Sequence, residues 1–514
     1  MDKSLMKPMK RYANLKELVN IAAEKYGTKD AYKFKRNKEI VSKTFVELKA
    51  DSQAFSNFLK AKDLLGKHVA VIGLSSYEWV VTYFGTVNSN SVIVPIDKEL
   101  PASEISELLN RADVEALVFD DVLSDRIEKI INSCPDIKYF IGMNKENDEG
   151  KILSFRKIIA ENQGDFDVEI DNDKMCTILF TSGTTGKSKG VMLTHTSLID
   201  NTICVEMGEQ ENSTVLSVLP IHHVYCFTCD ILVGLYLGSV VCFNDSIMRL
   251  AKNIAIFKPH IILLVPMIIE TLLFKLNEAA KANPNVPKQM LGQSIFGENL
   301  RRIYSGGAYL NPKLADGMAE FGIEILQGYG MSEFSPRISV NVHGCSKRGS
   351  VGFVVPTAEA KIEDGEILVR GKSMMLGYYK DEKNTNETIV DGWLKTGDLG
   401  YIDEDGFVFI TGRKKNLIIL ANGENVSPEE LENKFNGWYV AKELMVYSEN
   451  NQITCEIYPN NEVIAKANIT DVNAVVNAKV DEINSELPLY KRIAVVKIRE
   501  NEFEKTASGK IKRK

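Results

Sequence analysis

Short apolar segments alternate with amphipathic segments in the first part of the chain. The apolar segments lie at residues 69–72, 92–96 and 116–119, and stretches of helical character at 77–87 and 104–110 separate them. Strands without polar alternation are typical of sheets that helices cover, and helical connections are long enough to join parallel strands. This order predicts an α/β fold with helix-covered, mainly parallel sheets.

The chain changes character after about residue 360. Short strands are expected at 444–447, 453–458 and 493–498, and a helix over 471–487. At 514 residues the chain is too long for a single hydrophobic core. We predict a large N-terminal domain over residues 1–413 and a small α+β C-terminal domain over residues 414–514.

Charge and hydropathy exclude several classes of protein. The formal net charge is −7, which argues against nucleic-acid binding because that function needs a basic face. The most apolar region, residues 254–274, contains charged residues and prolines, so we expect no transmembrane segment. The chain start lacks the pattern of a secretory signal, and the eight cysteines are scattered, as in proteins of a reducing compartment. A cytoplasmic location is therefore expected.

A loop rich in hydroxyl groups, glycine and lysine follows an apolar segment at 176–180. Hydroxyls and backbone N–H groups can surround phosphate oxygens, glycine permits close approach, and lysine adds charge. The spacing is not that of P-loop NTPases, and apolar residues 191–193 predict a loop between two strands. The alternative is a flexible surface loop. The expected phosphate-binding residues are Thr181, Ser182, Gly183, Thr184, Thr185, Gly186 and Lys187.

The segment 181–190 resembles the phosphate-loop signature of the adenylate-forming superfamily, which includes acyl-CoA synthetases, luciferases and peptide-synthetase adenylation domains. Further signatures of this family follow in the right order across nearly the whole chain. The resemblance implies a large domain that binds ATP and the acid, and a small mobile domain that carries a catalytic lysine.

Two glycine-rich segments are similar to the next family signatures. At 305–308, the resemblance places Gly306, Gly307 and Ala308 beside the adenine and the acyl pocket. At 327–333, it implies that Tyr329 stacks on adenine, Ser332 contacts the α-phosphate and Glu333 helps to hold Mg²⁺. Ser332 replaces the usual threonine but keeps the hydroxyl. The remaining nucleotide-binding residues implied there are Gln327, Gly328 and Gly330. Either segment alone would read as a glycine-rich turn.

The C-terminal signatures supply the remaining implied nucleotide contacts and the catalytic lysine. Asp398 and Arg413 match the residues that contact the ribose, where a carboxylate suits a vicinal diol. Lys415 falls at the family hinge, and Gly423 would leave room for the thiol channel. Lys510 matches the catalytic lysine, whose ammonium stabilises the charge that grows on the phosphoryl oxygens. The alternative for this basic tail is a solvated, inert chain end.

A histidine and two cysteines allow two interpretations. His223 matches the family histidine that places the substrate carboxylate. The alternative is a metal cluster of His222, His223, Cys226 and Cys229, although no second ligand pair lies nearby in the sequence. We expect the cysteines to act as small apolar groups. The residues expected to line the acyl pocket are Tyr225, Cys226, Met331, Pro336 and Arg337.

Arg337 is unusual because it falls where relatives usually place an apolar pocket residue. A buried cation without a partner is costly. We therefore expect Arg337 to pair with a protein carboxylate, and the alternative is contact with a polar or acidic group of the substrate.

The resemblance implies a two-step reaction that uses ATP, Mg²⁺ and coenzyme A. A carboxylic acid and ATP give acyl-AMP and pyrophosphate, and the thiol then takes the acyl group. The tracts at 486–491 and 503–506 look most like long-chain fatty acyl-CoA synthetases, so a fatty acid is expected. The first alternative is an enzyme that loads an acyl carrier protein, and the second is a non-catalytic binding protein.

Overall fold

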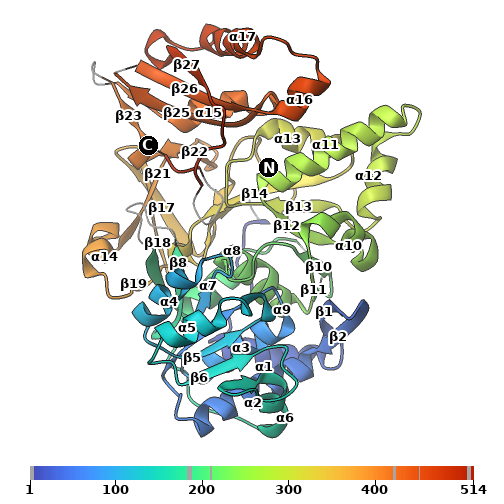
Figure 1. Ribbon diagram of the computed structural model, residues 1–514, viewed down its shortest axis with the longest axis vertical. Helices are drawn as coiled ribbons and strands as arrows, with labels where there is room; N and C mark the ends of the chain where they lie inside the picture. The colour runs from blue at the N-terminus through green and yellow to red at the C-terminus, as the bar shows by residue number, and fades with distance from the viewer. Residues whose placement is uncertain are drawn as a thin grey trace. The chain divides into compact units, whose positions relative to one another are not determined.

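The computed structural model describes residues 5–181, 188–208, 211–420, 424–450, 452–505 and 511–513 (Figure 1). The chain forms two compact units. The large unit contains Met1–Ala360 and Val369–Leu394, and the small unit contains Lys361–Leu368 and Lys395–Lys514. The domain boundary expected between residues 413 and 414 stays a prediction.

The first sheet of the large unit has the strand order β19-β9-β8-β4-β3-β5-β6-β7. Strands β3 to β8 pair in parallel, whereas β9 is antiparallel to both β8 and β19. The strands are β3 (His68–Ile72), β4 (Val92–Ile96), β5 (Val114–Phe119), β6 (Tyr139–Gly142), β7 (Ile152–Ser154), β8 (Met175–Thr181), β9 (Lys189–Thr194) and β19 (Gly377–Tyr378).

Helices cover this sheet because alternate strand residues bury apolar side chains toward opposite faces. Ala70 and Ile72 belong to one core cluster with residues of α4 and α5, whereas Val69 and Val71 are equally buried outside that cluster. Helices α1, α2 and α3 pack against one another (Figure 1). The helices are α1 (Leu15–Tyr26), α2 (Phe45–Ala61), α3 (Tyr77–Val87), α4 (Ala102–Arg111), α5 (Ile127–Ser133) and α6 (Phe155–Glu161).

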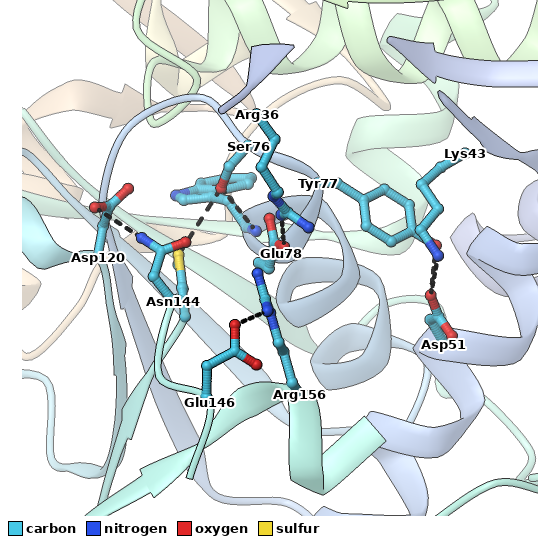
Figure 2. Close-up of polar contacts among 12 residues, drawn as sticks. Arg36, Lys43, Asp51, Ser76, Tyr77, Glu78, Asp120, Asn144, Glu146 and Arg156 are labelled. Carbon is cyan, nitrogen blue, oxygen red and sulfur yellow. Dashed lines mark hydrogen bonds and ion pairs between the residues drawn. The ribbon is translucent and has the colours of Figure 1, made fainter. Parts of the chain in front are cut away.

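Polar contacts hold the loops that follow β3, β5 and β6 (Figure 2). Asn144 donates to Oδ1 of Asp120 at 3.4 Å, and the hydroxyl of Ser76 caps α3 by accepting from the N–H of Trp79 at 3.3 Å. Glu78 of α3 also pairs with a guanidinium from β1. The carboxylates of Asp120 and Glu78 are buried, so these contacts supply partners that buried polar groups need.

The second sheet has the order β16-β15-β14-β13-β12-β10-β11-β1-β2. Its strand β1 pairs in parallel with β11, far along the chain. The strands are β1 (Asp30–Arg36), β2 (Glu39–Thr44), β10 (Thr214–Ser217), β11 (Val240–Phe243), β12 (Ile261–Leu264), β13 (Arg302–Ser305), β14 (Glu324–Gly330), β15 (Arg337–Val340) and β16 (Phe353–Val354).

Further helices of the large unit follow the strands of this sheet. Side chains of α10 to α13 share one core cluster with β10 to β13. The helices are α7 (His195–Thr202), α8 (Val224–Cys226), α9 (Val233–Leu237), α10 (Leu250–Phe257), α11 (Pro266–Ala282), α12 (Lys288–Phe296) and α13 (Pro312–Glu320). A π-helical turn, η3 (Phe227–Leu232), joins α8 to α9.

The small unit contains a three-stranded sheet, with β26 between β25 and β27, and a core shared with α15 and α17. Its elements are β22 (Val408–Arg413), β23 (Ile418–Ile419), β24 (Asn425–Val426), α15 (Pro428–Glu432), β25 (Ala441–Glu449), β26 (Gln452–Pro459), α16 (Asn461–Lys466), α17 (Val472–Ser485) and β27 (Val495–Ile498). The segments between 358 and 402 are β17 (Ala358–Glu363), β18 (Glu366–Gly371), α14 (Glu382–Thr388), β20 (Ile389–Val390) and β21 (Trp393–Ile402).

This architecture confirms the predicted α/β fold with mainly parallel, helix-covered sheets and a small α+β C-terminal part. Helix α3 spans the residues predicted for it, and α17 ends two residues before the predicted end at 487. Within the described ranges, no helix is long and apolar enough to cross a membrane.

Candidate active site

The predicted phosphate loop joins two antiparallel strands, as expected. Thr181 ends β8 and lies opposite Lys189, the first residue of β9. Nζ of Lys189 donates to Oδ1 of Asn384 at 2.6 Å and lies 4.7 Å from the ring centroid of Tyr378. These two contacts hold the side chain of Lys189 at the start of β9. Its other predicted residues, Ser182, Gly183, Thr184, Thr185, Gly186 and Lys187, lie outside the described residues.

The carboxyl ends of β13 and β14 lie side by side. Ser305 lies opposite Gln327 in the parallel pairing, so the two predicted glycine-rich segments start at one edge of the sheet. A Cβ atom at Gly306 would approach the ring of Tyr225 to 2.9 Å, so a side chain there would displace the tyrosine. Gly307 has a φ of +78°, a conformation that favours glycine, and Ala308 follows it.

The end of β14 turns sharply into β15. A Cβ atom at Gly330 would lie 2.0 Å from the carbonyl oxygen of Pro336, so no other residue fits. The N–H of Met331 donates to the same oxygen at 3.0 Å. This turn groups the predicted nucleotide-binding residues Gln327, Gly328, Tyr329, Gly330 and Ser332 with the predicted pocket residues Met331, Pro336 and Arg337.

The carboxylate of Glu333 is held by a tyrosine. The hydroxyl of Tyr378 donates to Oε1 of Glu333 at 2.8 Å, and the N–H of Met375 donates to the carbonyl of Glu333 at 2.9 Å. Burial, together with this carboxylate, raises the pKa of Tyr378 well above its ordinary value. Glu333 itself is partly exposed. A positioned, accessible carboxylate suits the oxygen ligation that Mg²⁺ prefers.

His222 and His223 differ in accessibility. Their ring centroids are 4.4 Å apart, and Nε2 of His222 lies 3.8 Å from Oδ1 of Asp97. Burial lowers the pKa of His222 well below its ordinary value, and His223 adds to that effect, so the ring of His222 stays neutral. His223 is exposed at the start of α8. The accessible histidine is therefore the one predicted to place the substrate carboxylate.

The side chains that follow His223 form a buried polar cluster. The hydroxyl of Tyr225 donates to the carbonyl of Tyr304 at 3.3 Å. The thiol of Cys226 lies 3.2 Å from the carbonyl of Leu219 and 3.5 Å from Oδ2 of Asp230. Asp230 is completely buried, and its Oδ1 has no hydrogen-bond partner in the described part of the chain. Burial raises the pKa of Asp230 to about 7.

The metal-cluster alternative gains no support from these contacts. Cys226 bonds to protein groups, and its thiol pKa is raised well above the ordinary value by burial, which disfavours the thiolate that binds metal. Over residues 5–181, 188–208 and the other described ranges, no three His, Cys, Asp or Glu side chains form a candidate metal site. Cys226 is a buried neutral thiol with protein hydrogen-bond partners, and its expected place in the acyl pocket stays a prediction.

Arg337 is buried but does not pair with a carboxylate. It is 8% exposed, and its Nη2 donates to the carbonyls of Asn201 and Thr202, the second at 3.1 Å. Both carbonyls belong to the last residues of α7, where helix carbonyls lack intrahelical partners. The expectation of a protein carboxylate partner is thus wrong for the described residues. The partial negative charge at the C-terminus of α7 is the partner of the Arg337 guanidinium instead.

The predicted ribose contacts lie together in the small unit. Asp398 of β21 lies opposite Arg413 of β22, and Nε of Arg413 is 2.6 Å from Oδ1 of Asp398. Next to this pair, Nζ of Lys414 donates to Oε2 of Glu366 at 2.7 Å. Lys415 lies in the following 3-10 turn, η6 (Lys414–Asn416), and its hinge role stays a prediction. Gly423 and Lys510 lie outside the described residues.

Three neighbours of these residues had no counterpart in the sequence-based prediction: Asn201, Asp230 and Tyr378. Asn201 lies next to the last residue of α7, a helix that was not predicted, and its contact with Arg337 spans 136 positions. Tyr378 follows Gly377 and precedes another tyrosine, without a spacing that indicates a site. Asp230 was the only acidic residue near Cys226 and Cys229, and that proximity was the one available signal.

Two family models match the chain: "AMP-binding enzyme" over residues 19–379, and "AMP-binding enzyme C-terminal domain" over residues 415–514. The chain is 28% identical over 423 residues to the long-chain-fatty-acid–CoA ligase FadD15 of Mycobacterium bovis, covering 72% of this chain and 69% of that protein. It is 33% identical over 411 residues to probable 4-coumarate–CoA ligase 1 of Dictyostelium discoideum, covering 73% and 71%. The crystal structure of the anthranilate CoA ligase AuaEII with anthranoyl-AMP has a similar fold, with a TM-score of 0.84, 23% identity and coverage of 99% and 97%.

Proposed function

The chain belongs to the AMP-binding enzyme family, and from that premise we propose that it is a fatty acid–CoA ligase that works through an acyl-adenylate. Activation of an acyl or aryl acid as its adenylate, followed by transfer to CoA, is the activity that its relatives support. The fatty acid is the finer part of the proposal. The long-chain-fatty-acid–CoA ligase relative and the closing tracts at 486–491 and 503–506 favour it.

One observation carries the proposal: β13 and β14 end at the same edge of one sheet. The predicted adenine-contacting segment from Gly306 to Ala308 and the predicted phosphate- and metal-contacting segment from Gln327 to Glu333 therefore start side by side. Ligands of open α/β sheets bind outside the carboxyl ends of the strands. Two segments predicted separately from the sequence thus start side by side, and this supports the proposal of a nucleotide site at that edge.

The first step joins the acid to the nucleotide. His223, exposed at the start of α8, orients the acid carboxylate, and an oxygen of that carboxylate attacks the α-phosphorus while pyrophosphate leaves. Lys510 stabilises the charge that develops on the phosphoryl oxygens. Glu333 would supply an oxygen ligand to Mg²⁺, which when bound neutralises phosphate charge.

The second step transfers the acyl group. We propose that the predicted C-terminal domain, residues 414–514, turns about Lys415, withdraws Lys510 and brings the loop containing Gly423 toward the pantetheine arm of CoA. The thiolate then attacks the acyl carbonyl carbon, and the bond to AMP breaks. Asp398 and Arg413 hold the ribose through both steps, because a carboxylate accepts hydrogen bonds from a diol.

A pyrophosphate-release assay tests the proposal. Purified protein with Mg-ATP is given fatty acids of several chain lengths, 4-coumarate and anthranilate, and thioester formation is then followed with CoA or with a holo acyl carrier protein. The expected result is pyrophosphate with a fatty acid and thioester only with CoA. If the thioester forms only on the carrier protein, the acceptor is that protein and not CoA. If no acid gives pyrophosphate, the proposed ligase activity is refuted.

A further inference from the structure

Arg337 is a buried cation whose hydrogen-bonding capacity is only partly used. A guanidinium has five N–H donors in a fixed fork. Nη2 donates to the carbonyls of Asn201 and Thr202, and Nε lies 3.5 Å from Oδ1 of Asn201, at the limit for a hydrogen bond. Nη1 finds no acceptor in the described part of the chain. Two donors of a side chain that is 8% exposed are therefore left for another group.

The protein holds the guanidinium in a fixed orientation. The side-chain oxygen of Asn201 accepts from the backbone N–H of Arg337 at 3.0 Å, and its amide donates to the carbonyls of Phe334 and Arg337 at 2.9 Å and 3.0 Å. Asn201 is itself completely buried. The unused edge of the fork is thus presented in one direction, which is the preorganisation that a binding site requires.

The neighbours of Arg337 do not neutralise its charge. Cys204, Cys229, Tyr225 and Tyr304 interact with it electrostatically. Burial raises the pKa of Cys204 to about 11 and that of Cys229 to about 12, so both thiols are neutral near pH 7. Burial also raises the pKa of Tyr225 well above its ordinary value. The end of α7 offers only about half an elementary charge.

Two residues next to Arg337 are accessible from outside the core. Tyr225 and Cys229 are partly exposed, whereas Cys204 and Asn201 are fully buried. Tyr225 also contacts Gly306, which begins one of the two segments at the proposed nucleotide site. A ligand that reaches Tyr225 from that segment therefore comes close to Arg337.

We propose that Arg337 determines substrate specificity: its Nη1 binds a second carboxylate carried by the fatty acid, so fatty acids with two carboxylates are preferred over monocarboxylic fatty acids of equal length. This inference rests on the proposed ligase function and names its substrate class. An anionic oxygen is the strongest acceptor for a guanidinium, and pairing would offset the cost of the buried charge. A bare alkyl chain would instead leave the two donors of Nη1 desolvated and unpaired.

Matched acids test this role. The value of kcat/KM for pyrophosphate release is measured with each dicarboxylic acid from succinic to dodecanedioic acid and with the monocarboxylic acid of the same length. The wild type is expected to prefer the dicarboxylic acid by about tenfold to a hundredfold at its best length, the value of hydrogen bonds to charged groups. Arg337→Leu should reverse that preference.

Two further variants separate specificity from a structural role. Arg337→Lys keeps a cation for the carbonyls that end α7 but lacks the fork, so the preference should fall several-fold in a protein that still folds. Arg348→Leu removes an exposed guanidinium that pairs with Asp316, and should leave the preference unchanged. Thermal melting reports whether each variant is folded.

The outcomes distinguish the two proposals. The role of Arg337 is overturned if the ratio of kcat/KM for the dicarboxylic acid to that for the monocarboxylic acid is the same in both Arg337 variants as in the wild type. It is also overturned if the wild type prefers the monocarboxylic acid at every length. Either result leaves the ligase intact, because pyrophosphate is still released. Absence of pyrophosphate with all acids, including monocarboxylic acids, overturns the proposed function itself.

Discussion

The two regions that hold the predicted ligand contacts differ in whether their buried charged side chains have ion-pair partners. The acid-side cluster of the large unit contains Asp230 and Arg337, and neither has an ion-pair partner among the described residues. The ribose-side cluster of the small unit contains the buried carboxylates Glu366 and Asp398, and each is paired with a cation. Asp398 pairs with Arg413, and Glu366 with the neighbouring lysine.

The difference lies in which partner is exposed. The side chains of Arg413 and Lys414 are 42% and 53% exposed, so the cations can move while the carboxylates of Asp398 and Glu366 stay fixed. Such half-exposed pairs contribute little to stability, and a ligand can replace one partner at small cost. In the acid-side cluster the uncompensated groups are fixed by burial, so their cost persists until a ligand or a proton neutralises them. We infer that the large unit selects the acid, and the small unit supplies exchangeable charge.

Substitution of Lys510 has the largest expected effect and tests the assignment of mobile charge to the small unit. Lys510→Ala should reduce acyl-AMP formation about 10³- to 10⁵-fold, the range for removal of a cation that stabilises a phosphoryl-transfer transition state. The reaction of synthetic acyl-AMP with CoA should change little, because the thiol step does not use this ammonium. Single-turnover assays of the two half-reactions measure both effects.

Lys512 provides the control for Lys510. It is an exposed lysine two residues along the same tail, so Lys512→Ala should leave both half-reactions unchanged. If Lys510→Ala slows both half-reactions equally, the proposed rotation of residues 414–514 between the two steps is contradicted. Lys510 would then not supply its charge to the adenylation step alone.

Substitution of Asp230 tests how much the burial of an unpaired carboxyl group in the large unit lowers the free energy of unfolding. The folded carboxyl has a pKa of about 7, against an ordinary value of 3.8. Between these values the folded state holds a proton that the unfolded state has lost, so this group reduces the free energy of unfolding as pH rises through the window. The full penalty, above the folded pKa, is at most about 4 kcal/mol.

Asp230→Asn removes the titration but keeps the shape of the side chain. The variant should gain stability relative to the wild type as the pH is raised from about 4 to about 8, as urea unfolding at each pH would measure. Asp125→Asn, at a largely exposed carboxylate, is the control. A stability difference that does not vary with pH would mean that Asp230 is not held in a neutral form, and the contrast with the paired carboxylates would fail.

Sequence patterns predicted the local parts of this molecule well. The apolar segments and helical spacing between residues 69 and 119 gave β3, α3, β4, α4 and β5 in the correct order, because each pattern reflects the period of its own element. The family resemblance assigned Gly306 and Gly330 to the site, and their close contacts give a physical reason for glycine at both positions.

Long-range partners could not be predicted in the same way. The pairing of β1 with β11 and the contact of Arg337 with the end of α7 join segments that no local pattern relates. The sequence indicated correctly that a buried Arg337 needs a partner. The predicted partner was a carboxylate because carboxylates can be read from the residue types. Backbone carbonyls at a helix end cannot, since every residue has one.

Substitution of Asp398 has the smallest expected effect and tests whether the ribose-side pair is exchangeable. Asp398→Asn keeps the shape but weakens acceptance from the ribose hydroxyls, and should raise KM for ATP by a factor that corresponds to about 1.5–3 kcal/mol. Glu456→Gln is the matched control, because Glu456 is a carboxylate of the same unit that is similarly buried and paired with Arg499. If both variants raise KM for ATP equally, the effect comes from loss of a buried ion pair in the small unit. If Asp398→Asn alone does so, and its melting temperature matches that of the control, the pair at Asp398 is the one that exchanges a cation for a ligand.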